Sequence, residues 1–197
     1  KQSIWVFADY RNYFQNRVTL QLLAKANDLA TGMNAEVCAV VFGHETDEYV
    51  AEYIAHGAQK VLVVKHPSLN RYSVEKFTFL MEKLAGDQGP EIILIGATSF
   101  GREFAPRVAK RLGTGLTADC IGLEMTSEGH LLQIAPSFGG NLIAEIITPD
   151  HRPQMATVRP GTFQELPHDN TRRGEVVQIP LPKKIPLDRL RLVAYER

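Results

Sequence analysis

The residues best suited to bind a ligand lie in a glycine-flanked loop, Gly96-Ala-Thr-Ser-Phe-Gly-Arg-Glu103. Glycines let a backbone approach a ligand closely, Thr98 and Ser99 offer hydroxyl groups or a helix cap, and Arg102 offers a forked cation. In a phosphate-binding loop a lysine would replace Arg102, and a magnesium-binding hydroxyl would replace Glu103. A carboxylate there would repel phosphates, which excludes a nucleoside triphosphatase. A capped helix start and a ligand-binding loop remain as interpretations.

Two later segments also contain residues that simple packing does not require. The double glycine of Phe138-Gly-Gly-Asn141 exceeds the need of a plain turn and indicates close approach by another group. Arg152 and Arg159 flank a short apolar run. Guanidinium groups near a strand end suit carboxylates of a partner chain or an anionic cofactor. Solvated surface arginines are the alternative.

The sequence predicts neither a metal site nor a catalytic nucleophile. Its 6 histidines show no i, i+4 pair and no nearby cysteine cluster. His56 precedes a glycine at an expected helix end, where it complements the helix dipole. Cys38 and Cys120 fall in strand patterns and are expected to pack as small apolar groups, with Asp119 as a strand-end carboxylate beside a buried thiol. The chain also lacks a Gly-x-Ser-x-Gly elbow.

The elements that must position these residues alternate in the first part of the chain. Continuous β-branched runs indicate strands covered on both faces, and helical patterns lie between them and after the last. The expected strands are Ser3–Ala8, Val37–Phe42, Val61–Val64 and Ile92–Ile95. The expected helices are Val18–Met33, Glu48–His56, Val74–Ala85 and Phe100–Leu112, each with a glycine near its end. Four such units predict a doubly wound, mostly parallel α/β sheet of Rossmann-like type.

After Gly115 the alternation ends. Strand patterns with little helix between them cover Thr117–Met125, Leu131–Ala135, Leu142–Thr148 and Met155–Val158. They predict that the domain finishes with antiparallel strands and a hairpin near Ser127-Glu-Gly129.

A basic, proline-rich tail follows these strands. Residues 1–150 hold 13 Lys+Arg and 17 Asp+Glu, whereas residues 151–197 hold 9 and 5, together with six of the 11 prolines. Prolines fix φ and remove backbone donors, so the segment is expected to be extended. We therefore predict an α/β domain over residues 1–163 and a linker or partner-clasping arm over residues 164–197.

Composition narrows the class of protein. The 197 residues include 22 Lys+Arg and 22 Asp+Glu, and this balance argues against a nucleic-acid-binding protein. No apolar run has the roughly 18 residues that a membrane span needs. Two cysteines cannot form a disulfide framework, so a reducing cytoplasm is the expected location.

Four segments, in order and spacing, resemble the alpha subunit of electron-transfer flavoproteins, in particular forms from anaerobes and nitrogen fixers. They are Gly96–Ala109, Thr114–Cys120, Phe138–Asn141 and the string Arg152-Pro-Gln-Met-Ala-Thr-Val-Arg-Pro-Gly161. The resemblance covers nearly the whole chain. It implies an electron carrier rather than an enzyme: a scaffold domain that forms a heterodimer with a beta subunit and passes electrons through FAD. The electrons come from NADH or from a flavin-dependent dehydrogenase, such as an acyl-CoA dehydrogenase.

In the resembled family a second alpha-subunit domain holds most of the FAD, and its flavin contacts have no counterpart in these 197 residues. Lys183 to Arg197 would then form the hinge toward that domain. The resemblance implies that the present domain docks the beta subunit and walls part of its flavin site. The expected wall residues are Gly139, Gly140, Asn141, Gln154 and Arg159, with Thr98, Ser99 and Arg102 as a further group.

One position departs from the resembled pattern. Many bacterial relatives have arginine before the Pro-x-Phe-Gly-Gly-Asn segment, where this chain has Ala135. A cation there would stabilise reduced, anionic flavin, so flavin-based electron bifurcation and simple one-electron transfer both stay open.

Two other functions are alternatives. A universal-stress-like domain would bind an adenine nucleotide in the loop after the first strand, Asp9–Phe14, although this loop is bulky and lacks glycine. A purely structural module would bind a partner without a flavin nearby.

Overall fold

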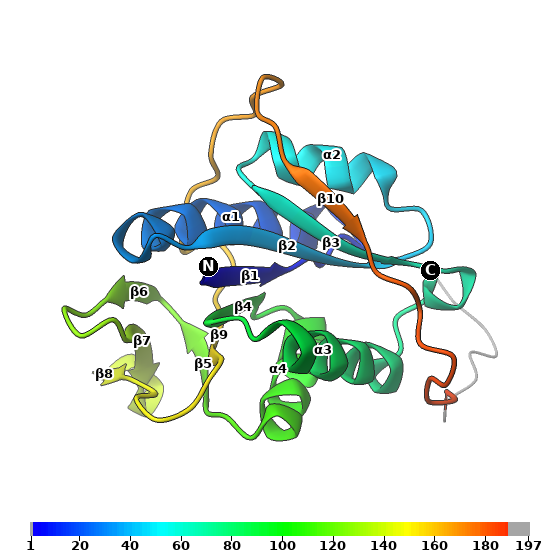
Figure 1. The fold of residues 1–197 in the computed structure, drawn as a ribbon. Coiled ribbons are helices and arrows are strands. Elements are labelled where there is room, and N and C mark those ends of the chain that lie inside the picture. The colour runs from blue at the N-terminus through cyan, green and yellow to red at the C-terminus, as the bar shows by residue number, and fades with distance from the viewer. Residues whose placement is uncertain (1, 189–197) are drawn as a thin grey trace.

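The computed structural model describes residues 2–188, and its main body is a 7-stranded parallel sheet with the strand order β10-β3-β2-β1-β4-β9-β5 (Figure 1). The predicted doubly wound α/β fold is therefore confirmed. The strands of this sheet are β1 (Ser3–Phe7), β2 (Glu36–Gly43), β3 (Lys60–Lys65), β4 (Ile92–Gly96), β5 (Leu116–Cys120), β9 (Gln154–Val158) and β10 (Glu175–Gln178).

Helices cover both faces of this sheet, which explains the continuous apolar runs. The helices are α1 (Tyr13–Met33), α2 (Asp47–Ala55), α3 (Val74–Gln88) and α4 (Ser99–Leu112), with short 3-10 turns η1 (Pro67–Leu69) and η2 (Phe138–Gly140). Along β1, Ile4 and Val6 pack in the core beneath α1 and α2, whereas Trp5 and Phe7 pack in the core beneath α3 and α4 (Figure 1).

Capping residues set the helix boundaries more than hydrophobic periodicity does. Helix α1 begins at Tyr13 rather than at the expected Val18, because the Asn12 side chain accepts a hydrogen bond from the Gln15 backbone N–H at 3.0 Å. It ends at Asn34, which adopts a left-handed conformation. Helix α3 likewise runs past Gly86 and stops at the left-handed Gly89.

The expected strand Thr117–Met125 is instead two strands in different sheets. Strand β5 lies at the edge of the main sheet, whereas β6 (Gly122–Met125) pairs with β7 (Leu131–Ser137) in an antiparallel sheet of 3 strands completed by β8 (Leu142–Ile146). Strand β9 returns to the main sheet and runs parallel to β4 and β5, between them. All five of its residues are buried, and only an interior strand can cover both of its faces.

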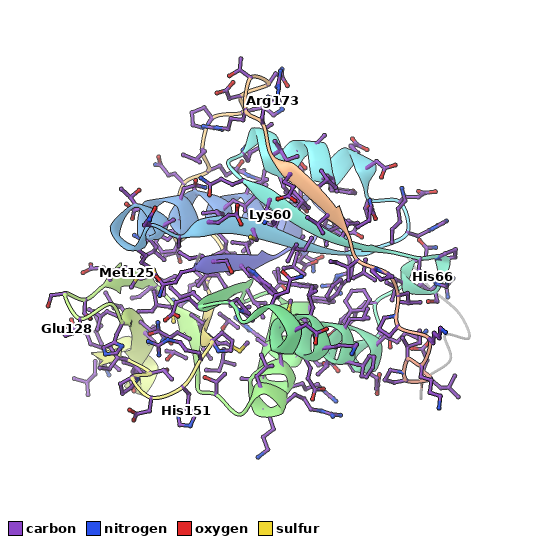
Figure 2. The ribbon with its side chains drawn as sticks, viewed as in Figure 1. Lys60, His66, Met125, Glu128, His151 and Arg173 are labelled. Atoms are coloured by element: carbon purple, nitrogen blue, oxygen red, sulfur yellow. The ribbon has the colours of Figure 1, made fainter. Side chains whose placement is uncertain are left out.

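The expected tail contributes to the main sheet. Strand β10 is parallel to β3, and the Lys60 ammonium group (Figure 2) lies 3.0 Å from Glu36 and 3.1 Å from Glu175, which ties this edge together. Before it, the chain crosses the helical layer, where the Asp169 N–H donates to the Ala55 carbonyl at 3.1 Å. The boundary at residue 163 stays a prediction, and residues 189–197 of the expected hinge lie outside the described residues.

Within residues 2–188, no helix combines the length and the apolar character that crossing a membrane requires.

The glycine in the first turn of α4 is required by contacts within the chain. A Cβ atom on Gly101 would lie 1.8 Å from the Gly96 carbonyl oxygen, whereas one on Gly86, in α3, would meet nothing within 4 Å. Gly101→Ala should therefore lower the free energy of unfolding by about 3 kcal/mol. Gly86→Ala should raise it by about 0.5–1 kcal/mol through helix propensity. Urea denaturation of both variants checks this, and equal stabilities would contradict the close-packing explanation.

Candidate functional site at the carboxyl edge of the sheet

The strand order places a crevice where β1 and β4 end side by side. Both strands are parallel neighbours in the sheet, but α1 leaves β1 toward one face and α4 leaves β4 toward the other. Open α/β sheets commonly bind ligands at such a switch point. Asp9 follows β1 and Thr98 follows β4, so these two residues determine what the crevice can accept.

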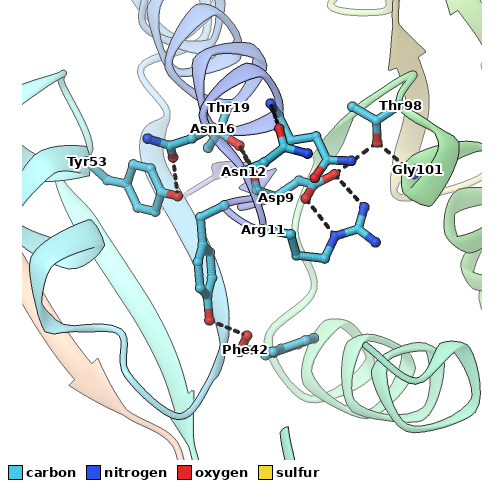
Figure 3. Close-up of polar contacts among 11 residues, drawn as sticks. Asp9, Arg11, Asn12, Asn16, Thr19, Phe42, Tyr53, Thr98 and Gly101 are labelled. Atoms are coloured by element: carbon cyan, nitrogen blue, oxygen red, sulfur yellow. Dashed lines mark hydrogen bonds and ion pairs between the residues drawn. The ribbon is translucent and has the colours of Figure 1, made fainter. Parts of the chain in front are cut away.

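The buried carboxylate of Asp9 connects the elements around this crevice (Figure 3). Its Oδ2 accepts a hydrogen bond from the Thr98 hydroxyl at 2.9 Å. The Arg11 guanidinium donates to both carboxylate oxygens, at 3.0 and 3.1 Å. The Asp9 backbone N–H donates to the Thr19 hydroxyl of α1 at 3.0 Å. Asp9 thus links β1 to α4 through its side chain and to α1 through its backbone N–H.

The Arg11 guanidinium also occupies the space that a ligand would need. It lies 3.8 Å from the ring centroid of Phe100 and 5.1 Å from that of Tyr72. The cavity left between these residues has a volume of about 50 Å³, far below the several hundred Å³ of typical ligand pockets. The crevice therefore does not fit an adenine nucleotide or a flavin, which argues against the universal-stress-like alternative.

Tyrosines close the other side of the crevice. The Tyr10 hydroxyl donates to the Phe42 carbonyl at 2.8 Å, and its ring lies 4.3 Å from that of Tyr49. Burial raises the pKa of Tyr10 to about 12, so its phenol remains a neutral donor. Tyr53 donates to Asn16 at 2.7 Å deeper in the same layer (Figure 3).

The loop before α4 is a capped helix start, one of the two interpretations of its sequence. Thr98 is the N-cap, and its hydroxyl accepts a hydrogen bond from the Gly101 N–H at 3.0 Å. Ser99 and Arg102 lie in the first turn of α4 with exposed side chains. Whether they also contact a ligand stays a prediction.

Arg102 and Arg159 meet at a residue whose importance the sequence did not indicate. The Asp119 carboxylate accepts hydrogen bonds from Arg159 at 2.6 and 3.3 Å, and a guanidinium nitrogen of Arg102 lies 3.8 Å away. The bonds from Arg159 hold the pKa of Asp119 below its ordinary value. The available sequence signal was only a carboxylate at a strand end.

Gln154 and Arg152 lie at the opposite end of β9 from Arg159. The fully buried Gln154 accepts a hydrogen bond from the Leu131 N–H at 2.7 Å and donates to Glu91 at 3.3 Å. Arg152 also bonds to Glu91. The two arginines therefore do not form one cationic site, and each contacts a carboxylate of this chain.

The double glycine forms the turn between β7 and β8. Gly139 and Gly140 have φ values of +66° and +93°, which side-chain-bearing residues rarely adopt. A Cβ atom on either would meet nothing within 4 Å, so the turn itself explains both glycines. Asn141, the exposed residue before β8, follows them, and Ala135 is buried on β7 opposite Ala144.

Both cysteines, Cys38 and Cys120, and His56 are buried in the structure. Burial raises the pKa of the Cys120 thiol to about 12. The Nδ1 atom of His56 lies 2.9 Å from the Leu166 carbonyl oxygen. Among residues 2–188, no group of three or more potential metal ligands comes together.

Comparison with known proteins identifies relatives along most of the chain. A family model described as the electron transfer flavoprotein domain matches residues 4–184. Electron transfer flavoprotein subunit alpha of Thermoanaerobacterium thermosaccharolyticum is 45% identical over 177 residues, which are 90% of this chain and 54% of the relative. Its counterpart in Clostridium acetobutylicum is 45% identical over 167 residues, 84% of this chain and 50% of that protein.

A third relative is subunit LctC of an Acetobacterium woodii lactate dehydrogenase (NAD(+),ferredoxin), 38% identical over 182 residues, 92% of this chain and 44% of its own length. The chain thus spans about half the length of the curated relatives it matches.

The Asp9 cluster should stabilise the fold measurably. Asp9→Asn keeps an acceptor for Thr98 but removes the charge that compensates the partly buried Arg11, so we expect a loss of about 2 kcal/mol in the free energy of unfolding. Asp47→Asn is the control, because the pair between Asp47 and Lys65 is exposed and should contribute little. Equal effects in urea denaturation would show that the Asp9 pair has no special role.

The Asp119 pair should contribute to stability in a pH-dependent way. A carboxyl whose pKa is lowered by folding stabilises the protein above its ordinary pKa of 3.8 and loses that effect as the pH falls through the lowered value. The stability difference between the wild type and Asp119→Asn should therefore be present at neutral pH and disappear in strong acid. Arg159→Gln should remove the same pH-dependent contribution to the free energy of unfolding. A difference that stays constant with pH would contradict the pairing.

Proposed function

Because the chain belongs to the electron transfer flavoprotein family, we propose that it is the scaffold part of an alpha subunit in a two-subunit electron carrier. A beta subunit binds it, and electrons pass through FAD between a donor, such as a flavin-dependent dehydrogenase or NADH, and an acceptor. The domain contributes the docking surface for the beta subunit and part of the flavin-site wall. The closed crevice supports a scaffold role for this domain, because FAD does not fit into the crevice.

The observation that carries the proposal is the apolar strand β8. Its large side chains and the next residue are well exposed: Leu142 57%, Ile143 65%, Ile146 39% and Ile147 43%. Apolar residues at this density on one exposed strand mark an interaction surface rather than ordinary surface composition.

Strand β8 is exposed on both faces. Its pairing with β7 places Ile146 opposite the buried Gln133, on the face that β7 turns toward the core, whereas Ile143 lies on the other face. Since Ile146 is exposed all the same, the strand extends beyond the main body. Strand β8 is also an edge of its sheet, with free backbone groups on its outer side. A partner that covers both faces would bury the apolar side chains, each contributing about 1.5–3 kcal/mol.

The proposed flavin wall fits this docking site. Gly139, Gly140 and Asn141 lead directly into β8, so a subunit bound to β8 would approach their exposed backbone. Arg159, Thr98, Ser99 and Arg102 would form a second part of the wall at the carboxyl edge. Gln154 is buried behind Leu131 and would support the wall without touching a flavin.

Ordinary electron transfer is the form of the activity that we propose. The Ala135 methyl group supplies no charge to an anionic flavin, so bifurcation would require another cation. Two cysteines are too few for a disulfide framework, which is compatible with a cytoplasmic location, and we also propose that location.

The partner surface can be tested with a charged double variant. Ile143→Asp with Ile146→Asp places charges on both faces of β8, and we expect at least a hundredfold weaker binding of the beta subunit, since two buried apolar contacts are lost. Val176→Asp is the matched control, because Val176 is similarly exposed but lies on β10. Co-purification and size-exclusion chromatography measure the complex, and flavin absorbance measures its cofactor.

Retention of the beta subunit by the double variant would contradict the assignment of β8. A complex without flavin in the wild type would favour the purely structural module instead.

A further inference from the structure

Asp119 has a backbone conformation that is uncommon for residues other than glycine. Its φ is +58°, in the left-handed region that most side-chain-bearing residues avoid. Among the described residues, the other non-glycine residue with this conformation is Asn34, which caps the end of a helix. Asp119 caps no helix and lies in β5, where the register toward β9 shifts between Thr117 and Cys120. Such conformations persist only where neighbouring contacts enforce them, and they concentrate at functional sites.

Contacts from β9 hold Asp119 in this conformation. Its N–H donates to the Thr157 hydroxyl at 2.9 Å, and the next residue, Cys120, accepts the Arg159 N–H at 2.9 Å. These bonds fix the backbone on both sides of the carboxylate. The side chain of Asp119 is therefore directed by β9, the strand that leads into Arg159.

The carboxylate in turn fixes the Arg159 guanidinium. Nε and one terminal nitrogen of Arg159 both donate to Oδ2 of Asp119, at 3.3 and 2.6 Å. The Arg159 carbonyl accepts from the Thr162 hydroxyl at 2.7 Å, so the backbone of the arginine is held as well. A guanidinium group that donates two hydrogen bonds to one oxygen has a defined plane, and its remaining N–H groups point in defined directions.

The cluster has more positive than negative charge. One carboxylate faces two guanidinium groups, and Arg102 is too far from it, at 3.8 Å, for a good hydrogen bond. The Arg102 and Arg159 side chains are 66% and 47% exposed. The pair therefore offers one uncompensated positive charge and free donors to an anion outside this chain.

We propose that Asp119 is a positioning residue that aims the Arg159 guanidinium, with Arg102 beside it, at an anionic group of the flavin cofactor in the assembled protein. This inference rests on the proposed function. The anionic group is either the cofactor's pyrophosphate or the reduced isoalloxazine ring.

Substitutions at Asp119 can separate charge, acceptor and backbone strain. Glycine at this position accepts a positive φ and removes the carboxylate, whereas asparagine tolerates the same φ and keeps an oxygen acceptor without the charge. The variants Asp119→Gly, Asp119→Asn, Arg159→Gln and the Asp119→Gly/Arg159→Gln double variant are compared in the assembled flavoprotein. Flavin dissociation on dilution and the reduction potential of the bound flavin are the two measurements.

We expect Asp119→Gly and Arg159→Gln each to weaken flavin retention, or the stabilisation of reduced flavin, by about tenfold. Asp119→Asn should lie between Asp119→Gly and the wild type. The double variant should match Arg159→Gln alone, because Asp119 acts through Arg159. A change in retention alone identifies the pyrophosphate, and a change in potential identifies the isoalloxazine ring.

Two results would overturn the assignment without affecting the proposed function. One is a flavin-loaded complex in which Asp119→Gly behaves as the wild type, and the other is a double variant whose effects are additive. A wild-type complex that holds no flavin would overturn both the proposed function and this assignment. Size-exclusion chromatography of each variant shows that the heterodimer is intact, so a loss of flavin cannot be attributed to dissociated subunits.

Discussion

The hydrogen bonds of the Asp9 carboxylate determine how this fold can be used. They join the end of β1 to Thr98, the cap of α4, and hold Arg11 against Phe100 in the switch-point crevice, while the Asp9 backbone N–H binds Thr19 of α1. The usual ligand position of an open α/β sheet is thereby filled by the chain's own side chains. A domain closed in this way must act through its outer surfaces, which here are an apolar strand and a pair of arginines.

Much of the scaffold could be predicted from the sequence, because buried parallel strands are continuous apolar runs and glycines follow helix ends. The sheet that each later strand joins could not be predicted. Met155–Val158 is too short for its periodicity to distinguish an interior parallel strand from an antiparallel one. Strand β10 was hidden because Glu175–Gln178 is mostly exposed and lies in a proline-rich segment. Pairing with β3, far away in sequence, creates this strand.

The candidate site was predictable in part, for a similar reason. Residue type and spacing identified Thr98, Arg102 and Arg159, but only tertiary structure brings Arg102 and Arg159 to the same carboxylate. A sequence cannot reveal that Asp119 has a positive φ, because aspartate tolerates that conformation but adopts it in only a minority of cases. Gln154 is expected in the flavin-site wall because of the family resemblance, and only the structure shows that its buried amide binds the Leu131 N–H and joins the two sheets. A sequence motif can therefore contain buried residues that support a surface as well as exposed residues that belong to it.

The features proposed to act in function all lie after Gly115 or face that part of the chain. Up to Leu112 the local preferences agree with the doubly wound pattern, and the result is a closed, well-packed scaffold. The departures from that pattern then follow in sequence: the strained Asp119, the division of a strand between two sheets, the exposed β8 and the return of β9 that brings Arg159 beside Asp119. Local conflicts of this kind reduce stability and are retained where they serve another purpose. Binding of a second subunit offers such a purpose, because it would cover the apolar strand and supply the anion that the two arginines lack.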